Sequence, residues 1–196
     1  MDLEFEKLYK LGTDVAAFLF FDPDLLSHRA EEKNIAWWSD DFRQEFSQGT
    51  LAAFCTGSDG QFTMKFVQRP LSQVEREVLV SSGSFRFVVR NGRFYWDNSN
   101  GLPCEDQLDD PHDDENGWVA IENGQYKLTV HALDWYSVSD SKRELAGDIS
   151  HYIVELERAG EWGDIAIPEQ LPWLMPSKQW HEQRLQQLNS LYEDMS

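Results

Sequence analysis

Short glycine-containing turns constrain the fold of this chain more than any other feature. Asn91-Gly92 and Asn123-Gly124 each lie between two runs in which apolar and polar side chains alternate. An Asn-Gly pair adopts positive φ at both central turn positions at little cost, as a two-residue type I′ turn requires. The sequence therefore predicts two antiparallel hairpins, with both glycines at positive φ. The predicted hairpins cover residues 88–95 and 119–128.

Asp59-Gly60 is a third candidate turn, and the glycines of the three turns are 32 residues apart. Either a degenerate repeat or shared turn chemistry accounts for this spacing. We favour shared turn chemistry because the residues between the turns do not match. After this turn, Phe62, Met64 and Phe66 alternate with polar residues, which is typical of a strand with one buried face.

Other segments have clear local patterns. Strands are expected over Val15–Phe21 and His151–Leu156, and a weaker pattern indicates a strand over Leu133–Val138. A short helix is expected over residues 40–47, where two phenylalanines are four residues apart. Residues 75–80 fit either a strand or a short helix, since Ser72 and Glu75 have the spacing of a capping box. 

The character of the chain changes after Gly163. Three prolines fall within nine residues and predict an extended connector. After Ser177, a plausible N-cap, the apolar residues Leu185, Leu188, Tyr192 and Met195 recur at helical spacing. We expect a β-rich domain over residues 1–163, a connector over 164–176, and an amphipathic helix over 177–196 that packs on the domain; binding of a partner by this helix is the alternative.

These elements predict an all-β or β-rich (α+β) fold, an antiparallel sandwich or barrel of about eight to ten strands built from hairpins. Hydrophobic residues make up 41% of the 196 residues, enough for a core and against wholesale disorder. Eight tryptophans are present. We expect Trp96 and Trp118 in the core, and one of Trp37 and Trp38 exposed.

The charge is strongly negative and uneven. The chain has 35 acidic and 17 basic side chains, for a formal net charge of −18. A field of this sign repels phosphates and anionic lipid headgroups, which argues against nucleic acid and membrane partners. Neither a signal peptide nor a membrane span is visible, and two cysteines make no disulfide framework. These features favour a reduced, cytoplasmic protein.

One acidic run stands out between the second and third predicted pairs of strands. It contains seven carboxylates within eleven residues and no basic side chain. We expect a solvated loop with one of three roles: a solubilising surface, a cation site, or a contact surface for a basic partner. The EF-hand register fails at positions 1 and 12, and His112 alone makes no zinc site. The candidate partner-binding residues are Glu105, Asp106, Asp109, Asp110, Asp113, Asp114 and Glu115.

The sequence contains no motif for a catalytic nucleophile, a phosphate-binding loop or a metal ligand set. His131 and His151 lie in or beside expected strands, where packing or exposure explains them. The expected function is therefore that of an acidic binding protein, of the immunity or inhibitor type, which neutralises a basic partner such as a nuclease. No cofactor or metal is implied. The alternatives are a carbohydrate- or Ca²⁺-binding β-sandwich, or an enzyme of unrecognised class.

Overall fold

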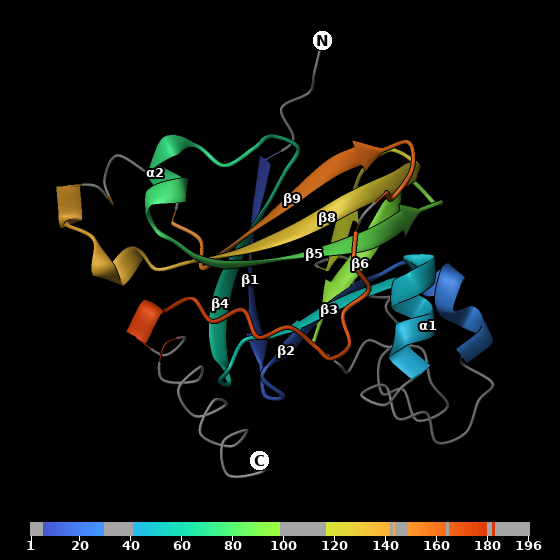
Figure 1. Ribbon diagram of the computed structural model, residues 1–196, viewed down its shortest axis with the longest axis horizontal. Helices are drawn as coiled ribbons and strands as arrows, with labels where there is room; N and C mark the ends of the chain where they lie inside the picture. The colour runs from blue at the N-terminus through green and yellow to red at the C-terminus, as the bar shows by residue number, and fades with distance from the viewer. Residues whose placement is uncertain are drawn as a thin grey trace.

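The computed structural model describes residues 6–29, 41–98, 117–141, 143, 149–163, 165–179 and 182, and strands are the main secondary structure among them (Figure 1). The strands are β1 (Glu6–Thr13), β2 (Ala17–Phe21), β3 (Leu51–Cys55), β4 (Gly60–Val67), β5 (Leu79–Val89), β6 (Arg93–Asp97), β7 (Trp118–Ala120), β8 (Gly124–Leu133) and β9 (Tyr152–Ala159). They form a five-stranded sheet with the order β1-β4-β9-β8-β5 and a four-stranded sheet with the order β3-β2-β6-β7. The prediction of a β-rich fold is confirmed.

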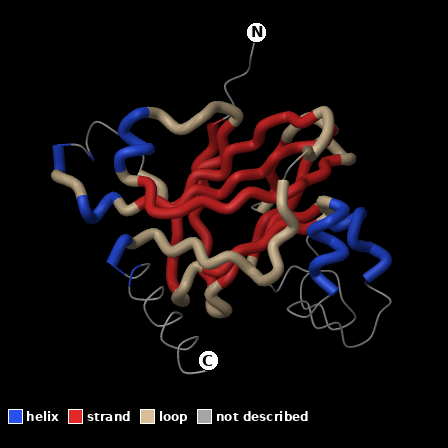
Figure 2. The backbone as a smooth tube through the Cα atoms, viewed as in Figure 1, coloured by secondary structure: helices blue, strands red, loops and turns tan. Residues whose placement is uncertain are grey.

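The helices are short and lie at the periphery of the strands (Figure 2). Helix α1 (Asp41–Gln48) matches the helix expected from the two phenylalanines. Helix α2 (Gln73–Glu77) begins with a capping box, in which the Ser72 side chain accepts from the Glu75 backbone and the Glu75 side chain accepts from Ser72. The capping-box alternative is thus confirmed for this segment. The described residues also form two 3-10 helices, η1 (Pro23–Arg29) and η4 (Trp135–Ser137).

The two predicted Asn-Gly hairpins are wrong. Strand β5 pairs with β8 rather than with β6, and β7 pairs with β6 rather than with β8. Each Asn-Gly pair therefore connects one sheet to the other. Gly92 has the expected positive φ of 70°, whereas Gly124 does not have a positive φ. The turn at Asp59-Gly60 also crosses between sheets, from β3 to β4.

The pairing instead produces one long bent hairpin. One arm runs through β5 and β6 and the other through β7 and β8, and both arms change sheet at their Asn-Gly corner. The corners touch: the Gly92 N–H donates to Oδ1 of Asn123 at 2.6 Å, and the Ile121 N–H donates to the Gly92 carbonyl at 3.0 Å. Turn chemistry alone does not distinguish this corner from a hairpin, because both need a sharp local change of direction.

The five-stranded sheet is mixed, because β4 and β9 are parallel while its other pairs are antiparallel. The prediction of a purely antiparallel arrangement is therefore wrong. The weak strand expected over residues 133–138 is also wrong, since this segment turns into η4. There the Asp134 side chain accepts from the N–H groups of Tyr136 and Ser137 and so favours a helical turn.

Aromatic side chains from the two sheets meet in one core. Phe20 of the four-stranded sheet contacts Phe66 of the five-stranded sheet at 5.9 Å between ring centroids. Phe54 and Tyr152 meet across the sheets at 4.9 Å, and Phe94 meets Phe87 at 5.1 Å. Most of these contacts are edge-to-face, the arrangement that the ring quadrupole favours.

The connector after residue 164 closes one side of this core. The Cys55 N–H donates to the Pro172 carbonyl, and the Leu174 N–H donates to the Cys55 carbonyl, each at 2.9 Å. Leu174 is buried in the main core cluster, and its carbonyl accepts from the Tyr152 hydroxyl at 2.9 Å. Most of the expected C-terminal helix over 177–196 lies outside the described residues.

Candidate functional site

The acidic run Glu105–Glu115 lies outside the described residues, but the strands on either side of it are described. Strand β6 ends at Asp97, β7 begins at Trp118, and the two strands are paired. The Trp96 N–H donates to the Gly117 carbonyl at 3.0 Å. The residues that flank segment 99–116 on its two sides therefore lie at neighbouring positions of the four-stranded sheet.

Packing around the start of β7 secures this end of the sheet. The Arg93 guanidinium lies 3.8 Å from the centroid of the Trp118 ring, and the Tyr95 ring meets Trp118 at 5.2 Å. The Tyr9 hydroxyl donates to the Trp118 carbonyl at 2.9 Å. This bond connects β7 to β1, which is an edge strand of the five-stranded sheet. Trp118 is only half-buried, whereas Trp96 is in the core as expected.

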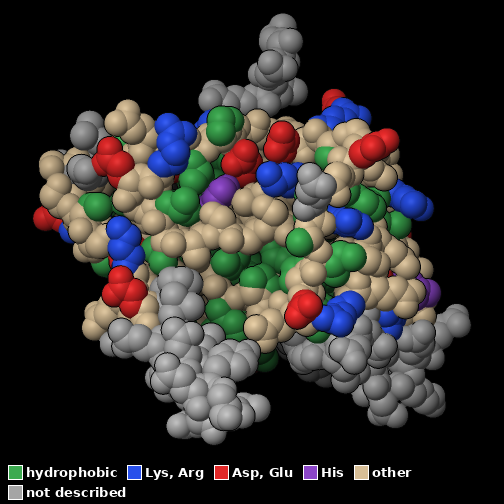
Figure 3. Space-filling view, in the orientation of Figure 1, with side chains coloured by type: hydrophobic (Ala, Val, Ile, Leu, Met, Phe, Trp, Pro, Cys, Tyr) green, Lys and Arg blue, Asp and Glu red, His purple; other side chains and the backbone are tan. Residues whose placement is uncertain are grey.

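The described residues carry little of the net charge. They include 18 of the 35 acidic side chains and 14 of the 17 basic ones. Acidic and basic side chains are interspersed over the face where β8 and β9 lie (Figure 3). Most of the excess of carboxylates therefore belongs to the remaining segments, and seven of those carboxylates belong to the acidic run.

On the outer face of the five-stranded sheet, a serine, a histidine and a glutamate line up across three strands. Ser82 Oγ lies 2.8 Å from Nδ1 of His131, and Nε2 of His131 lies 3.1 Å from Oε2 of Glu155. Burial lowers the pKa of His131, and the neighbouring Glu155 carboxylate opposes this shift. A nucleophile, a base and an acid at these distances have the order used in acyl transfer.

Two observations favour a structural role for this row. None of its three residues lines the pocket described below, and Ser82 is exposed on the sheet face. The next residues on the same strands repeat the pattern, since Ser84 Oγ lies 3.0 Å from Thr129 Oγ1. We therefore interpret the row as a ladder of cross-strand hydrogen bonds.

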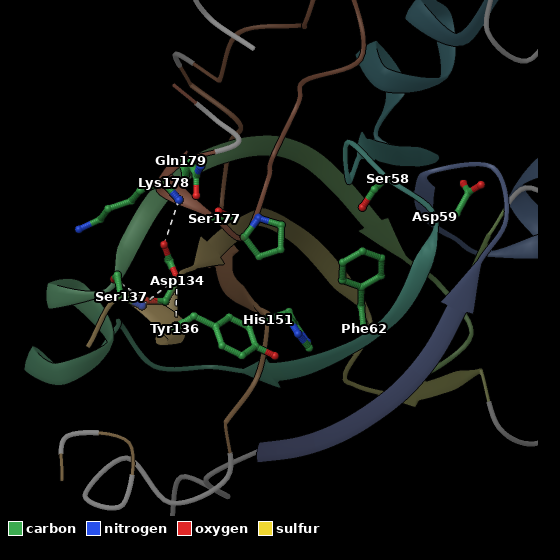
Figure 4. Close-up of a pocket in the computed structure, with 11 residues that line it drawn as sticks. Ser58, Asp59, Phe62, Asp134, Tyr136, Ser137, His151, Ser177, Lys178 and Gln179 are labelled. Atoms are coloured by element: carbon green, nitrogen blue, oxygen red, sulfur yellow. Dashed lines mark hydrogen bonds between the residues drawn. The ribbon is translucent and has the colours of Figure 1, made fainter. Parts of the chain in front are cut away.

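A pocket of about 700 Å³ lies at one end of the five-stranded sheet (Figure 4). Four separate segments line it: the β3–β4 turn with Ser58 and Asp59, strand β4 with Phe62, the η4 region, and residues 176–179. His151, just before β9, also lines it. The rings of Tyr136, His151 and Phe62 lie in a row, with centroids 6.5 Å apart for the first pair and 5.6 Å for the second.

Hydrogen bonds fix the protonation of His151. The Thr63 N–H donates to Nδ1 of His151 at 3.0 Å, so the neutral ring carries its hydrogen on Nε2. The His151 N–H in turn donates to Thr63 Oγ1 at 3.1 Å. Burial lowers the pKa of His151, so the ring is neutral near pH 7. Among the described residues, no group forms a hydrogen bond with Nε2 of His151.

Asp134 holds two walls of the pocket together. Its Oδ1 accepts from Tyr136 and Ser137, and its Oδ2 accepts from the Lys178 N–H at 3.0 Å. The Lys178 side chain itself points away from the Tyr136, His151 and Phe62 rings (Figure 4). Sequence reasoning missed this pocket because its residues are spread over more than a hundred positions.

Other candidate chemistry finds little support in the described part of the chain. No group of three or more His, Cys, Asp or Glu side chains there is arranged to hold a metal ion. Cys55 has a free thiol, and burial raises its pKa, which lowers its reactivity. Cys104 lies outside the described residues. No described helix is long and apolar enough to cross a membrane.

Comparisons with known proteins give one family match and two matches to solved structures. A model for a family of unknown function, DUF6386, matches residues 5–134. The protein of crocagin biosynthetic gene J is 16% identical, with a TM-score of 0.50 over 79% of this chain and 98% of that one. At this identity the likeness concerns the fold alone. ComJ from Bacillus subtilis, an inhibitor of the DNA-degrading activity of NucA, is 13% identical, with a TM-score of 0.49 over 80% of this chain and 99% of that one. No curated protein matches the chain.

Proposed function

The chain belongs to the DUF6386 family of unknown function, and we propose that it is an acidic binding protein that inhibits or sequesters a basic protein partner, such as a nuclease. The observation that carries this proposal is the concentration of carboxylates in one segment. Seven of them fall within eleven residues between two paired strands. A dense patch of one sign speeds the encounter with a partner of opposite sign and disfavours other partners.

The anchoring of the segment supports this function. Because β6 and β7 are paired, segment 99–116 starts and ends on one small part of a packed sheet. Residues that flank binding segments on rigid scaffolds are commonly fixed in this way. The described surface, where acidic and basic side chains nearly balance, contributes much less to a directed field.

The experiment compares association rates with a partner captured from a native lysate and then purified. In one variant Asp109, Asp110, Asp113 and Asp114 become Asn, which removes four charges and keeps side-chain size. We expect association to slow about tenfold at low salt, with a small change in dissociation. The difference between wild type and variant shrinks as salt rises, because screening is strong beyond about 8–10 Å at physiological ionic strength.

A matched control removes four charges elsewhere. Exposed acidic residues of the described surface become amides in this variant, namely Asp140, Glu157, Glu161 and Glu169. If this control slows association as much as the first variant, net charge alone drives binding and the acidic run has no special role. If neither variant changes binding, the proposed contact surface is wrong.

A cation site in the acidic run predicts a different result. Millimolar Ca²⁺ then raises the melting temperature of the wild type and leaves that of the four-Asn variant unchanged, because a ligand that binds only the folded state stabilises it. Melting curves with and without Ca²⁺ therefore separate the cation role from the partner-binding role.

A further inference from the structure

The five-stranded sheet ends in β1, a strand whose outer edge is open. Strand β1 pairs with β4 over its whole length without a register shift, and with no other described strand. Lys10 lies opposite Thr63, and the Thr63 N–H donates to His151 on the β9 side. Opposed residues of an antiparallel ladder point their backbone groups either both toward or both away from each other. The N–H and carbonyl groups of Lys10, and those of Leu8 and Glu6 at alternate positions, therefore point away from β4.

The other three sheet edges of the described residues are protected. On β3, the N–H and carbonyl of Cys55 bond to the connector. Strand β5 has an irregular register between Leu79 and Ser81, and its Val88 N–H donates to the Gly49 carbonyl at 2.8 Å. Strand β7 has only three residues. In the described part of the chain, no group bonds to the outward backbone groups of β1, so this strand is the long, unshielded edge that can pair with a further strand.

Three exposed side chains line the outer face of this edge, those of Glu6, Leu8 and Lys10. Leu8 is 40% exposed, which is high for a leucine in a strand of the sheet. The Lys65 ammonium lies 2.8 Å from Oε1 of Glu6, and this hydrogen bond lowers the pKa of Glu6. Along the strand, the edge therefore carries a negative, an apolar and a positive side chain in turn. Such a series is its own complement when the strand direction is reversed.

We propose that two copies of this chain pair through β1, antiparallel, about a two-fold axis at Leu8. Glu6 of each copy then lies opposite Lys10 of the other copy, and the two Leu8 side chains meet. Each of these residue pairs exchanges two backbone N–H···O bonds, because all three residues have outward backbone groups. The two five-stranded sheets become one continuous sheet. The pairing does not rest on the proposed function, since no residue of the acidic run takes part in it.

The charges along β1 select this register. A two-fold axis perpendicular to the sheet keeps every side chain on its own face, so the axis passes through a pair of identical residues. An axis at residue 7 or residue 10 places two lysines opposite each other, which is unfavourable. An axis at Tyr9 leaves Lys10 opposite Leu8 and Glu6 opposite Gly12. Among these registers, the axis at Leu8 is the one that pairs opposite charges.

The interface is small, so we expect a weak, reversible dimer with a Kd on the order of 100 µM. Sedimentation equilibrium of the full chain, at about 10 µM to about 1 mM, measures this Kd. Each copy carries a formal net charge of −18, so the measurement is made at physiological ionic strength, where charges beyond about 8 Å are screened. Dilute samples are then monomeric, and the cost of a substitution in the single chain can be measured separately.

Charge reversal tests the register. Lys10→Glu places two carboxylates opposite each other at both ends of the interface, and we expect it to weaken the dimer at least tenfold. Glu6→Lys places two ammonium groups there and has a similar effect. An equal mixture of the two variants should associate within about threefold of the wild type, because every negative side chain again faces a positive one. Lys178→Glu, the same change at an exposed residue outside β1, leaves the Kd unchanged.

A backbone substitution tests the edge itself. Leu8→Pro removes an N–H that points away from β4, so the β1–β4 ladder keeps its bonds, and proline is tolerated at such edge positions. We expect this variant to retain the folded NMR spectrum and to remain monomeric at about 1 mM. A wild type that is monomeric at this concentration overturns the proposal. So does a dimer that persists unchanged in Lys10→Glu and Leu8→Pro, because it then forms through another surface. If both single-charge variants fold but their mixture does not associate, the register at Leu8 is wrong.

Discussion

The two sheets of this protein have different environments on their outer faces. In the five-stranded sheet, apolar residues face the core, and the opposite face is lined with hydrogen-bonded and charged side chains such as Ser82, His131 and Glu155. In the four-stranded sheet, all five residues of β2 are buried, and so are the first four of β3. The first sheet therefore meets water on one side, and the second is covered on both.

The difference determines what stabilises each sheet. In the four-stranded sheet, side chains on both faces stabilise the folded state because their apolar surface is removed from water. On the outer face of the five-stranded sheet, neighbouring polar groups replace water in one another's hydrogen bonds, which yields a small net gain. Substitutions at equivalent outer positions of the two sheets should thus differ severalfold in cost.

The largest expected effect comes from a matched pair of leucines. Leu19 faces outward in β2 and is 0% exposed, while Leu8 faces outward in β1 and is 40% exposed. We expect Leu19→Ala to lower the free energy of unfolding by about 3–4 kcal/mol, through lost burial and a residual cavity. Leu8→Ala should cost less than about 1 kcal/mol. Urea unfolding measures both, and equal costs would mean that the two outer faces do not differ.

The next largest loss of stability is expected from replacement of the buried carboxylate of Glu45. Glu45 of α1 is fully buried and accepts from Arg29 at 2.8 Å, from His28, and from Thr50. Burial by itself would raise the pKa of Glu45, but these hydrogen bonds outweigh it and lower the pKa. We expect Glu45→Gln to cost about 2–3 kcal/mol, because the nearly buried Arg29 guanidinium loses its charged hydrogen bond with the Glu45 carboxylate.

Chemical unfolding checks this cost, with the exposed neighbour Gln44→Ala as a control that should stay within about 0.5 kcal/mol of the wild type. If Glu45→Gln is equally mild, then the ion pair does not hold η1 and α1 together, and packing alone accounts for the buried side of the molecule.

Glu75 lies in α2, just before β5 of the five-stranded sheet. Its replacement is expected to cause a smaller loss of stability that depends on pH. Burial would raise its pKa, but hydrogen bonds from Arg69 and Ser72 outweigh burial and lower it from 4.5 to about 2. The stabilisation by this carboxylate is therefore present above about pH 5 and is lost as pH falls toward 2. We expect Glu75→Gln to cost about 1–2 kcal/mol at pH 7.

Melting temperatures of wild type and Glu75→Gln at several pH values provide the measurement. The two curves should converge between about pH 5 and pH 2, because the wild-type carboxyl becomes protonated there. A gap that stays constant across this range would show that the carboxylate charge is not what stabilises the α2 cap.

The smallest effect on stability is expected in the row of Ser82, His131 and Glu155. Glu155→Gln should change the free energy of unfolding by less than about 1 kcal/mol. It should lower the pKa of His131 further, because burial already lowers this pKa and Glu155 is the main neighbour that opposes the shift. NMR titration of both histidines measures this, and the pKa of His151 should not change. An unchanged pKa of His131 would mean that the contact with Glu155 is not formed in solution.

The sequence predicted local elements better than connections between them. Alternation in β4 and β8, the helix of Phe42 and Phe46, and the capping box at Ser72 are each determined by residues close in the chain, and each was found. The partner of each strand was not predictable, because an Asn-Gly pair suits a corner between sheets as well as a hairpin. The candidate pocket could not be predicted for the same reason. It is assembled from segments that meet only after β4 and β9 pair.

The position of β9 within its sheet affects the order in which the protein can be built. It is the last of the described strands along the chain, yet it lies between β4 and β8, and its parallel pairing joins Met64 to Tyr152. Contacts of such long sequence separation form slowly, because a large loop must close first. During synthesis on the ribosome, β4 and β8 are therefore left with open edges until residues 152–159 emerge. Open edges attract other strands, so a nascent chain at this stage depends on rapid completion, or on chaperones, to avoid self-association.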